Sequence, residues 1–290
     1  MLEFKPIRLS DGEAVREALA ESGYDGCEYS FGNLFCWRDV YKNEVCFHKN
    51  TLFIKNQNGY YFPAGQVDTE NALFLITEHA KNNGKPIKFA TVPKQKLGEL
   101  TSLSEGKASS PRDLFDYVYT RESLASLRGK KLHAKRTNAA RFYEFCGGDF
   151  TYEPLTEYNI EECKTLSFNW CQENNVDIGN QKDSCAVDEG LENFFALGFV
   201  GGMLRAFGKP VAFTYGERLN HDTFVSHVEK AMSAIQGTYA AINTEFAQNA
   251  LDGYVYINRE DDTGSENLRK AKLSYDPIKM IEKFTFEVKG

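Results

Sequence analysis

Residues 254–277 constrain the fold of this chain more than any other stretch. They begin with a run of aromatic and β-branched side chains, residues 254–257, which favours a buried strand. Residues 263–266 have the Thr-x-x-Glu pattern of a capping box, so a helix is expected from there to about Leu273. Pro277 prevents that helix from continuing far. The sequence therefore predicts a strand, a polar loop and a helix in immediate succession.

The predicted loop and helix carry charges of both signs. Because ligands of open α/β sheets bind at the carboxyl ends of the strands, these charges form a candidate site. Arg269 and Lys272 are three residues apart and share a face of the helix. The alternative is that the charges pair with one another and with the helix dipole, and only brace the loop. The candidate binding residues are Asn258, Arg259, Glu260, Asp261, Arg269 and Lys272.

Composition narrows the class of protein. A length of 290 residues favours two domains over one. The net charge of −7 argues against a general nucleic-acid binder, but it leaves room for a local basic patch. Seven cysteines without a Cys-x-x-Cys pair predict a reduced, cytoplasmic protein with no metal site. The N-terminus does not have the pattern of a signal peptide, and the longest apolar run, residues 194–204, is too short to span a bilayer.

The predicted elements fall into two similar series. Residues 1–127 alternate helices and strands, and residues 151–290 follow a similar order. We therefore expect two α/β domains, each with a central mixed sheet. Residues 128–150 are expected to form a basic linker helix between them.

The start of this linker differs sharply from the rest of the acidic chain. Residues 128–141 contain six basic side chains and His133, and no acid. One interpretation is a linker helix with a solvated cationic side. The other is an anion-binding strip for a phosphate, coenzyme A or the end of a tRNA.

Several stretches match one family in detail. The longest comprises residues 258–264 followed by 268–275. The others are residues 30–37, Lys135-Arg136 with Phe142, residues 227–231, and Gly237-Thr238-Tyr239 with Asn243. In these stretches the chain resembles the tandem-GNAT family named after the C-terminal domain of phosphatidylglycerol lysyltransferase, to which FemX-type peptidyltransferases are more distantly related.

The resemblance implies two tandem GNAT-like acyltransferase domains. It also implies transfer of an acyl or aminoacyl group, from acyl-CoA or aminoacyl-tRNA, to an amine or hydroxyl of a small-molecule or peptide acceptor. In a GNAT sheet the donor enters where two strands part, which here corresponds to the strands ending near His227 and Asn258. The basic helix would then contact tRNA. The donor-binding residues that the resemblance adds are Lys135, Arg136, Lys230, Gly237, Thr238 and Asn243.

The segment at residues 234–240 departs from the GNAT pattern, because it has one glycine where GNAT enzymes commonly have two in the loop that holds the pyrophosphate of coenzyme A. The N–H groups at the helix start still suit an anion. The departure favours an alternative function, a non-catalytic binding or scaffold protein that has lost donor binding.

Three side chains are candidates for the chemistry. His227 and Glu229 are two residues apart and share a face of a regular strand. A histidine near its ordinary pKa could remove a proton from an attacking amine, and a carboxylate could orient it or act as the base. Tyr239, or alternatively Tyr275, could protonate the leaving group. The structural alternatives are a histidine and tyrosines that only satisfy hydrogen bonds.

Overall fold

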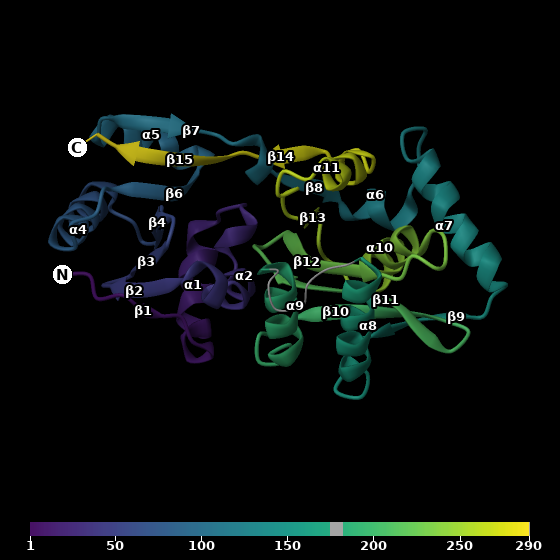
Figure 1. Cartoon of the computed structure of the whole chain (residues 1–290). Coiled ribbons are helices and arrows are strands. Elements are labelled where there is room, and N and C mark those ends of the chain that lie inside the picture. Colours follow the sequence, from purple (N-terminus) through teal and green to yellow (C-terminus); the bar gives the residue numbers. More distant parts are fainter. Residues whose placement is uncertain (175–181, 290) are drawn as a thin grey trace. The chain divides into compact units, whose positions relative to one another are not determined.

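The computed structural model describes residues 1–174 and 182–289 (Figure 1). The polar loop that the sequence predicts at residues 173–182 therefore lies largely outside the described residues. The chain forms two compact units, an N-terminal unit of Met1–Asp116 with Ile281–Gly290 and a C-terminal unit of Tyr117–Met280. Within the described ranges, no helix has the length and apolar character needed to cross a bilayer.

The N-terminal unit is built on an eight-stranded sheet, with the strand order β1-β2-β3-β4-β6-β15-β7 and β5 paired to β3. β4 and β6 pair in parallel, whereas β2 and β3 are antiparallel, so the sheet is mixed. Its strands are β1 (Lys5–Pro6), β2 (Glu44–His48), β3 (Thr51–Asn56), β4 (Gly59–Tyr61), β5 (Ala64–Gly65), β6 (Lys88–Pro93), β7 (Gly106–Ser109) and β15 (Lys283–Val288). Its helices are α1 (Gly12–Ser22), α2 (Phe31–Cys36), α3 (Arg38–Tyr41), α4 (Thr69–Asn82) and α5 (Lys94–Leu103).

The C-terminal unit is built on a seven-stranded sheet, with the order β14-β8-β13-β12-β11-β10-β9. β12 and β13 pair in parallel, whereas β10, β11 and β12 pair antiparallel. Its strands are β8 (Asp116–Thr120), β9 (Phe150–Pro154), β10 (Val200–Ala206), β11 (Lys209–Arg218), β12 (Thr223–Ala231), β13 (Tyr256–Asn258) and β14 (Lys279–Ile281). Its helices are α6 (Arg121–Ser126), α7 (His133–Cys146), α8 (Ile160–Glu173), α9 (Lys182–Glu192), α10 (Thr238–Asn249) and α11 (Glu266–Leu273).

Two mixed α/β sheets confirm the predicted fold class, but the chain divides at other positions than the sequence predicts. β8 was expected in the first domain and pairs instead with β13. β15 was expected in the second domain and pairs instead with β6 and β7 of the N-terminal unit. The predicted linker helix is α7, which belongs to the C-terminal unit and buries Ala139 and Phe142 in its core. The element order alone does not reveal which ladder a strand joins, and this is the reason for the difference.

A buried ionic cluster holds β15 in the N-terminal unit. Nζ of Lys283 lies 2.7 Å from Oε2 of Glu28, 2.6 Å from Oδ1 of Asp116 and 3.3 Å from Sγ of Cys27. These three residues also have the spacing of metal ligands. The Lys283 ammonium lies at hydrogen-bond distance from all of them, so it is the cation that compensates the carboxylates of Asp116, which is buried, and Glu28, which is 13% exposed.

Removing this ammonium should destabilise the N-terminal unit strongly. Lys283→Ala leaves Glu28 and Asp116 buried without their cation, so the free energy of unfolding in urea should fall by about 3–5 kcal/mol. Lys289→Ala is the matched control, because its ion pair with Glu105 is exposed and should be worth at most about 1 kcal/mol. Equal losses in the two variants would contradict the role given to Lys283.

Candidate functional site

The parallel contact between β12 and β13 is short. It extends from the pair of Thr223 and Tyr256 to the pair of Val225 and Asn258. Beyond this point β12 continues to Ala231, whereas the chain after Asn258 forms a loop. We call the end of β12 (residues 226–231) and this loop (residues 259–264) the divergence. The divergence is the place at which the sequence analysis expects the donor to enter.

A β-bulge places His227 at the divergence. On the neighbouring strand, Gly216 pairs with Ser226 and Tyr215 pairs with Val228, so His227 has no partner in the ladder. A bulge breaks the regular alternation of side chains and commonly re-aims one of them beside a functional site. The side chain of His227 thereby reaches the loop after β13.

His227 lies between two carboxylates. Its Nδ1 is 2.8 Å from Oε1 of Glu260, and its Nε2 is 3.1 Å from Oε1 of Glu217. Burial alone would lower the pKa of His227, but the hydrogen bonds to Glu217 and Glu260 outweigh that effect and raise the pKa to about 9. The ring is therefore an imidazolium at neutral pH, with both N–H groups donated. This arrangement does not suit the predicted role of His227 as a general base, because a base needs a free lone pair.

A second pair also joins β12 to the loop. Arg259 donates two hydrogen bonds to Glu229, from Nε at 2.9 Å and from Nη2 at 2.6 Å. Nδ2 of Asn243, on α10, donates to the same carboxylate at 3.0 Å. Burial would lower the pKa of Arg259, but Glu229 raises it overall. Two buried atoms here, Nη1 of Arg259 and Oδ1 of Asn243, have no hydrogen-bond partner among the described residues.

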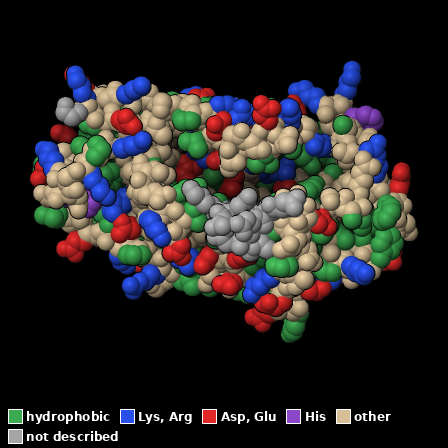
Figure 2. All heavy atoms as spheres, viewed as in Figure 1, with side chains coloured by type: hydrophobic (Ala, Val, Ile, Leu, Met, Phe, Trp, Pro, Cys, Tyr) green, Lys and Arg blue, Asp and Glu red, His purple; other side chains and the backbone are tan. Residues whose placement is uncertain are grey.

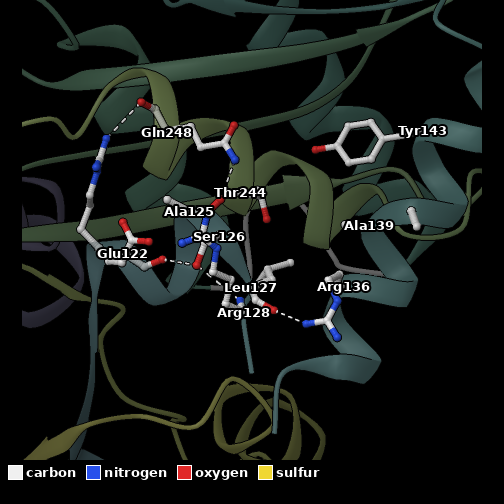
Figure 3. Close-up of a pocket in the computed structure, with 12 residues that line it drawn as sticks. Glu122, Ala125, Ser126, Leu127, Arg128, Arg136, Ala139, Tyr143, Thr244 and Gln248 are labelled. Carbon is white, nitrogen blue, oxygen red and sulfur yellow. Dashed lines mark hydrogen bonds between the residues drawn. The ribbon is translucent and has the colours of Figure 1, made fainter. Parts of the chain in front are cut away.

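Helix α7 brings one of its basic residues to this pair. Nζ of Lys135 lies 4.2 Å from the centre of the Tyr275 ring, and the Arg259 guanidinium carbon lies 4.6 Å from the same ring. Burial, and then repulsion by Arg259, lower the pKa of Lys135. The side chain of the next residue, Arg136, instead donates to the carbonyl of Leu127 at 2.6 Å (Figure 3). The two basic residues that the resemblance singles out thus have different surroundings.

The remaining charges of the loop and of α11 hold the loop in shape. Asp262, which is fully buried, accepts hydrogen bonds from Arg269 at 2.8 and 3.0 Å and from the Tyr117 hydroxyl at 2.5 Å. The hydrogen bond from Arg269 lowers the pKa of Asp262. Nζ of Lys272 donates to the carbonyls of Arg259, at 2.6 Å, and of Asp261. Arg269 and Lys272 therefore follow the structural alternative of the sequence analysis.

Glu260 takes a strained position in this loop. Its φ of +57° lies in the left-handed region, which side chains other than glycine rarely adopt and which is often found at functional sites. The side chain of Asn258 supports this turn by accepting the backbone N–H of Glu260 at 2.8 Å. The turn brings the Glu260 carboxylate back to His227.

The start of α10 lies against α7. Gly237 has φ +93°, and a Cβ atom built on it would lie 1.9 Å from the carbonyl oxygen of Asn138. The single glycine of this segment therefore makes room for the backbone of α7. The hydroxyl of the next residue, Thr238, donates to the carbonyl of Ile235 at 2.7 Å.

The last two predicted residues, Lys230 and Tyr239, both contact Trp170. Nε1 of Trp170, on α8, donates to the hydroxyl of Tyr239 at 2.8 Å, and Nζ of Lys230 lies 3.7 Å from the centre of a Trp170 ring. Tyr239 is 42% exposed, so its hydroxyl group is in reach of a ligand. Tyr275, the alternative proton donor, is buried, which raises its pKa to about 12.

Sequence reasoning missed Glu217, Asp262 and Trp170. An acid at the end of the apolar strand β11 is unusual, because ionised side chains are seldom buried without a partner, and this could have pointed to Glu217. Asp262 follows two other acids and cannot be told from them in the sequence.

Comparisons with known proteins agree with the resemblance. The sequence model of the family described as "Phosphatidylglycerol lysyltransferase, C-terminal" matches residues 19–287. A conserved protein of unknown function from Bacteroides thetaiotaomicron is 38% identical, with 100% of both chains covered and a TM-score of 0.94. No curated protein matches the chain in sequence.

Two more distant structures share the fold. The C-terminal domain of a putative lysylphosphatidylglycerol synthetase from Agrobacterium fabrum has a TM-score of 0.69 at 15% identity, over 97% of this chain and 93% of that one. FemX has a TM-score of 0.60 at 9% identity, over 99% and 97% of the two chains. At these identities the similarity establishes the fold alone.

The raised pKa of His227 predicts a pH-dependent stability. A group whose pKa rises on folding contributes stability that is complete below its ordinary pKa of 6.5 and is lost as the pH rises to about 9. Urea unfolding should show a loss of about 3 kcal/mol over this range, at about 1.4 kcal/mol per unit. His227→Gln should abolish this dependence, whereas His221→Gln, at an exposed side chain, should leave it unchanged. A profile that is the same in His227→Gln and in the unmodified chain would refute the assignment.

The contact between Gly237 and α7 can be tested with two glycines of nearly equal φ. Gly253 has φ +95°, close to the +93° of Gly237, but its Cβ position is open. Gly253→Ala should therefore report the backbone strain alone, about 1 kcal/mol or somewhat more. Gly237→Ala should lower the free energy of unfolding by at least about 2 kcal/mol more, since α7 must move. Equal effects would mean that α7 does not require this glycine.

Proposed function

Because the chain belongs to the family of phosphatidylglycerol lysyltransferase C-terminal domains, we propose that it is an aminoacyltransferase. It moves an aminoacyl group from the ester of an aminoacyl-tRNA to an amine or hydroxyl of a small-molecule or peptide acceptor. The observation that carries this proposal is the charged divergence, which the pairs Glu260–His227 and Glu229–Arg259 cross.

The charges at the divergence favour an ionic donor group. The Glu217–His227–Glu260 group has two carboxylates around one imidazolium, so it carries a net charge of −1 when His227 is protonated. A fixed negative charge attracts the α-ammonium group of an aminoacyl ester, and it offers nothing comparable to the neutral acyl chain of an acyl-CoA. The contact of Gly237 with α7 also argues against acyl-CoA as the donor. α10 begins without a second glycine at which the pyrophosphate of coenzyme A could approach closely.

In this transfer the acceptor nitrogen or oxygen attacks the ester carbonyl, and the bond to the ribose oxygen breaks. The acceptor loses one proton, and the ribose oxygen gains one. The paired carboxylates bind and orient the aminoacyl group, and they need no rearrangement during the reaction. Tyr239 is the residue that we assign to the leaving oxygen, since the residue is 42% exposed and Trp170 positions its hydroxyl group.

A non-catalytic binding protein is the second candidate. The pairing at the divergence favours it, because Glu229 and Arg259 make a two-point ion pair that a donor must pass or displace. A transfer assay with charged tRNAs and with acyl-CoAs separates the two functions. If the folded chain transfers no group from any of these donors, a non-catalytic binding protein is the function that remains.

Glu260→Gln should impair transfer more than its effect on folding explains. The change removes a negative charge beside His227, so kcat/KM with a charged tRNA should fall tenfold or more per folded molecule, about 1.4 kcal/mol for each factor of ten. Glu266→Gln is the matched control, because this side chain is 84% exposed on α11 and lies 3.7 Å from its ion-pair partner Lys270. Unchanged transfer by Glu260→Gln would exclude the Glu217–His227–Glu260 group from the site.

A further inference from the structure

Cys27 and Lys283 place an oxidisable sulfur beside a nucleophilic nitrogen in the N-terminal unit. The thiol lies in η2, a short 3₁₀ helix (Cys27–Tyr29), and the amine lies at the start of β15, 256 residues further along the chain. Nζ of Lys283 is 3.3 Å from Sγ of Cys27. Two reactive groups that the fold holds this close react far more readily than the same groups in solution.

This pair is shielded from solvent. Lys, Arg, Asp and Glu side chains are plentiful on the face of the molecule in Figure 2, but Lys283 is only 6% exposed and Cys27 only 5%. A bulky thiol such as glutathione does not fit against a sulfur with so little exposure, whereas a small oxidant needs much less room. Once Cys27 is oxidised, the amine of Lys283 is therefore the nucleophile at hand.

Asp116 positions the sulfur and contacts both reacting groups. Its Oδ2 accepts the backbone N–H of Cys27 at 2.8 Å, and its Oδ1 accepts the thiol S–H at 3.3 Å. The same Oδ1 lies 2.6 Å from Nζ of Lys283. An ammonium must lose a proton before its nitrogen can attack, and this carboxylate oxygen is in place to accept that proton.

The Lys283 ammonium also assists oxidation of the sulfur. Peroxides react with the thiolate form of cysteine, and a neighbouring cation stabilises the negative charge on sulfur. Cys46, in the same unit, has a similar exposure of 6%, but there burial raises the pKa of the thiol. We therefore expect an oxidant to modify Cys27 in preference to Cys46.

We propose that hydrogen peroxide converts Cys27 and Lys283 into a sulfenamide, a direct sulfur–nitrogen bond. In the first step Sγ attacks one peroxide oxygen, the S–O bond forms, the O–O bond breaks, and the thiol proton leaves in a water molecule. In the second step Nζ attacks Sγ, the S–N bond forms, the S–O bond breaks, and a second water leaves. The ammonium gives one proton to this water and one to Asp116. Sulfur is oxidised by two electrons, and the peroxide is reduced.

The bond changes the cluster without changing its net charge. Lys283 loses its positive charge, and Asp116 loses its negative charge by protonation, so the sum over the cluster is the same before and after. The bond also ties β15 to η2 and closes a loop of 256 residues, which restricts the unfolded chain. A dithiol such as dithiothreitol reverses the reaction, because a thiolate attacks the sulfur and releases the amine. This modification is independent of the proposed function.

The test treats the full chain carrying Cys185→Ser, which lacks the exposed cysteine, with hydrogen peroxide and then unfolds it in N-ethylmaleimide. Trypsin does not cut after a modified lysine, so the bond should join the peptide of residues 17–38 to that of residues 280–289. Mass spectrometry should find the joined peptide two hydrogens lighter than the two parts together, with the maleimide on Cys36 counted. Dithiothreitol should return the separate peptides.

Three variants in the Cys185→Ser background identify the two atoms. Cys27→Ser keeps a hydrogen-bonding group beside Asp116 and should give no joined peptide. Lys283→Arg keeps the positive charge, but its guanidinium does not attack sulfur, so Cys27 should instead be oxidised further to the sulfinic acid. Cys46→Ser is the matched control, which should give the joined peptide in the same yield. Melting curves show which variants are folded before oxidation.

Four results would overturn the inference. The first is a Cys27 thiol that stays reduced under conditions that oxidise Cys185 of the unmodified chain. The second is oxidation of Cys27 to a sulfinic acid or a disulfide without any joined peptide. The third is a joined peptide that persists in Cys27→Ser, because Cys36 would then be the partner. The fourth is a joined peptide heavier by one oxygen, because sulfur and nitrogen would then not be bonded directly.

Discussion

The early separation of β12 from β13 is the constraint on which the C-terminal unit depends. Once the two strands part, β12 no longer supplies partners to the backbone of residues 259–264, and buried backbone groups need partners. On the other side of the loop, the backbone of Tyr117 still bonds Arg259 and Glu260. Side chains supply further partners. Lys272 donates to two carbonyls of the loop, and Asn258 and Asp262 accept the N–H groups of Glu260 and Gly264. The charged residues that look like a binding site in the sequence are therefore needed to build the loop that presents it.

Charge burial explains why the pairs at the divergence come together. A carboxylate leaves water at a large cost unless a cation or several hydrogen-bond donors compensate it. Neutral His227 could donate only one N–H, so one of its two carboxylate neighbours would face a lone pair. Protonation satisfies both neighbours, and this fixes the ring as a cation that positions Glu217 and Glu260. The N-terminal unit solves the same problem with Lys283.

The sequence predicts local features of this region well and its pairings poorly. A strand followed by a polar loop and a helix is confirmed, as β13 and α11. The helix begins two residues later than the capping-box pattern suggests, because Ser265, and not Thr263, accepts the N–H of Leu268. Thr263 instead has a φ of +50° within the loop. The partners Glu217, His227 and Glu260 come from three separate elements, and only the bulge in β12 and the turn at Glu260 bring them into contact. The spacing of these residues in a single sequence does not predict that the three side chains are in contact.

Helix α10 is a rigid element that connects α7 to the divergence. Its first residue follows Gly237, whose contact with Asn138 fixes the helix against α7, and most of its length is buried. Asn243, in the second turn of α10, donates to the Glu229 carboxylate at 3.0 Å, so the anchored helix also holds one partner of Arg259. The Glu229–Arg259 pair is therefore fixed from two sides, by α10 and by the loop after β13. A charged pair that is held in this way keeps its geometry without a closing movement.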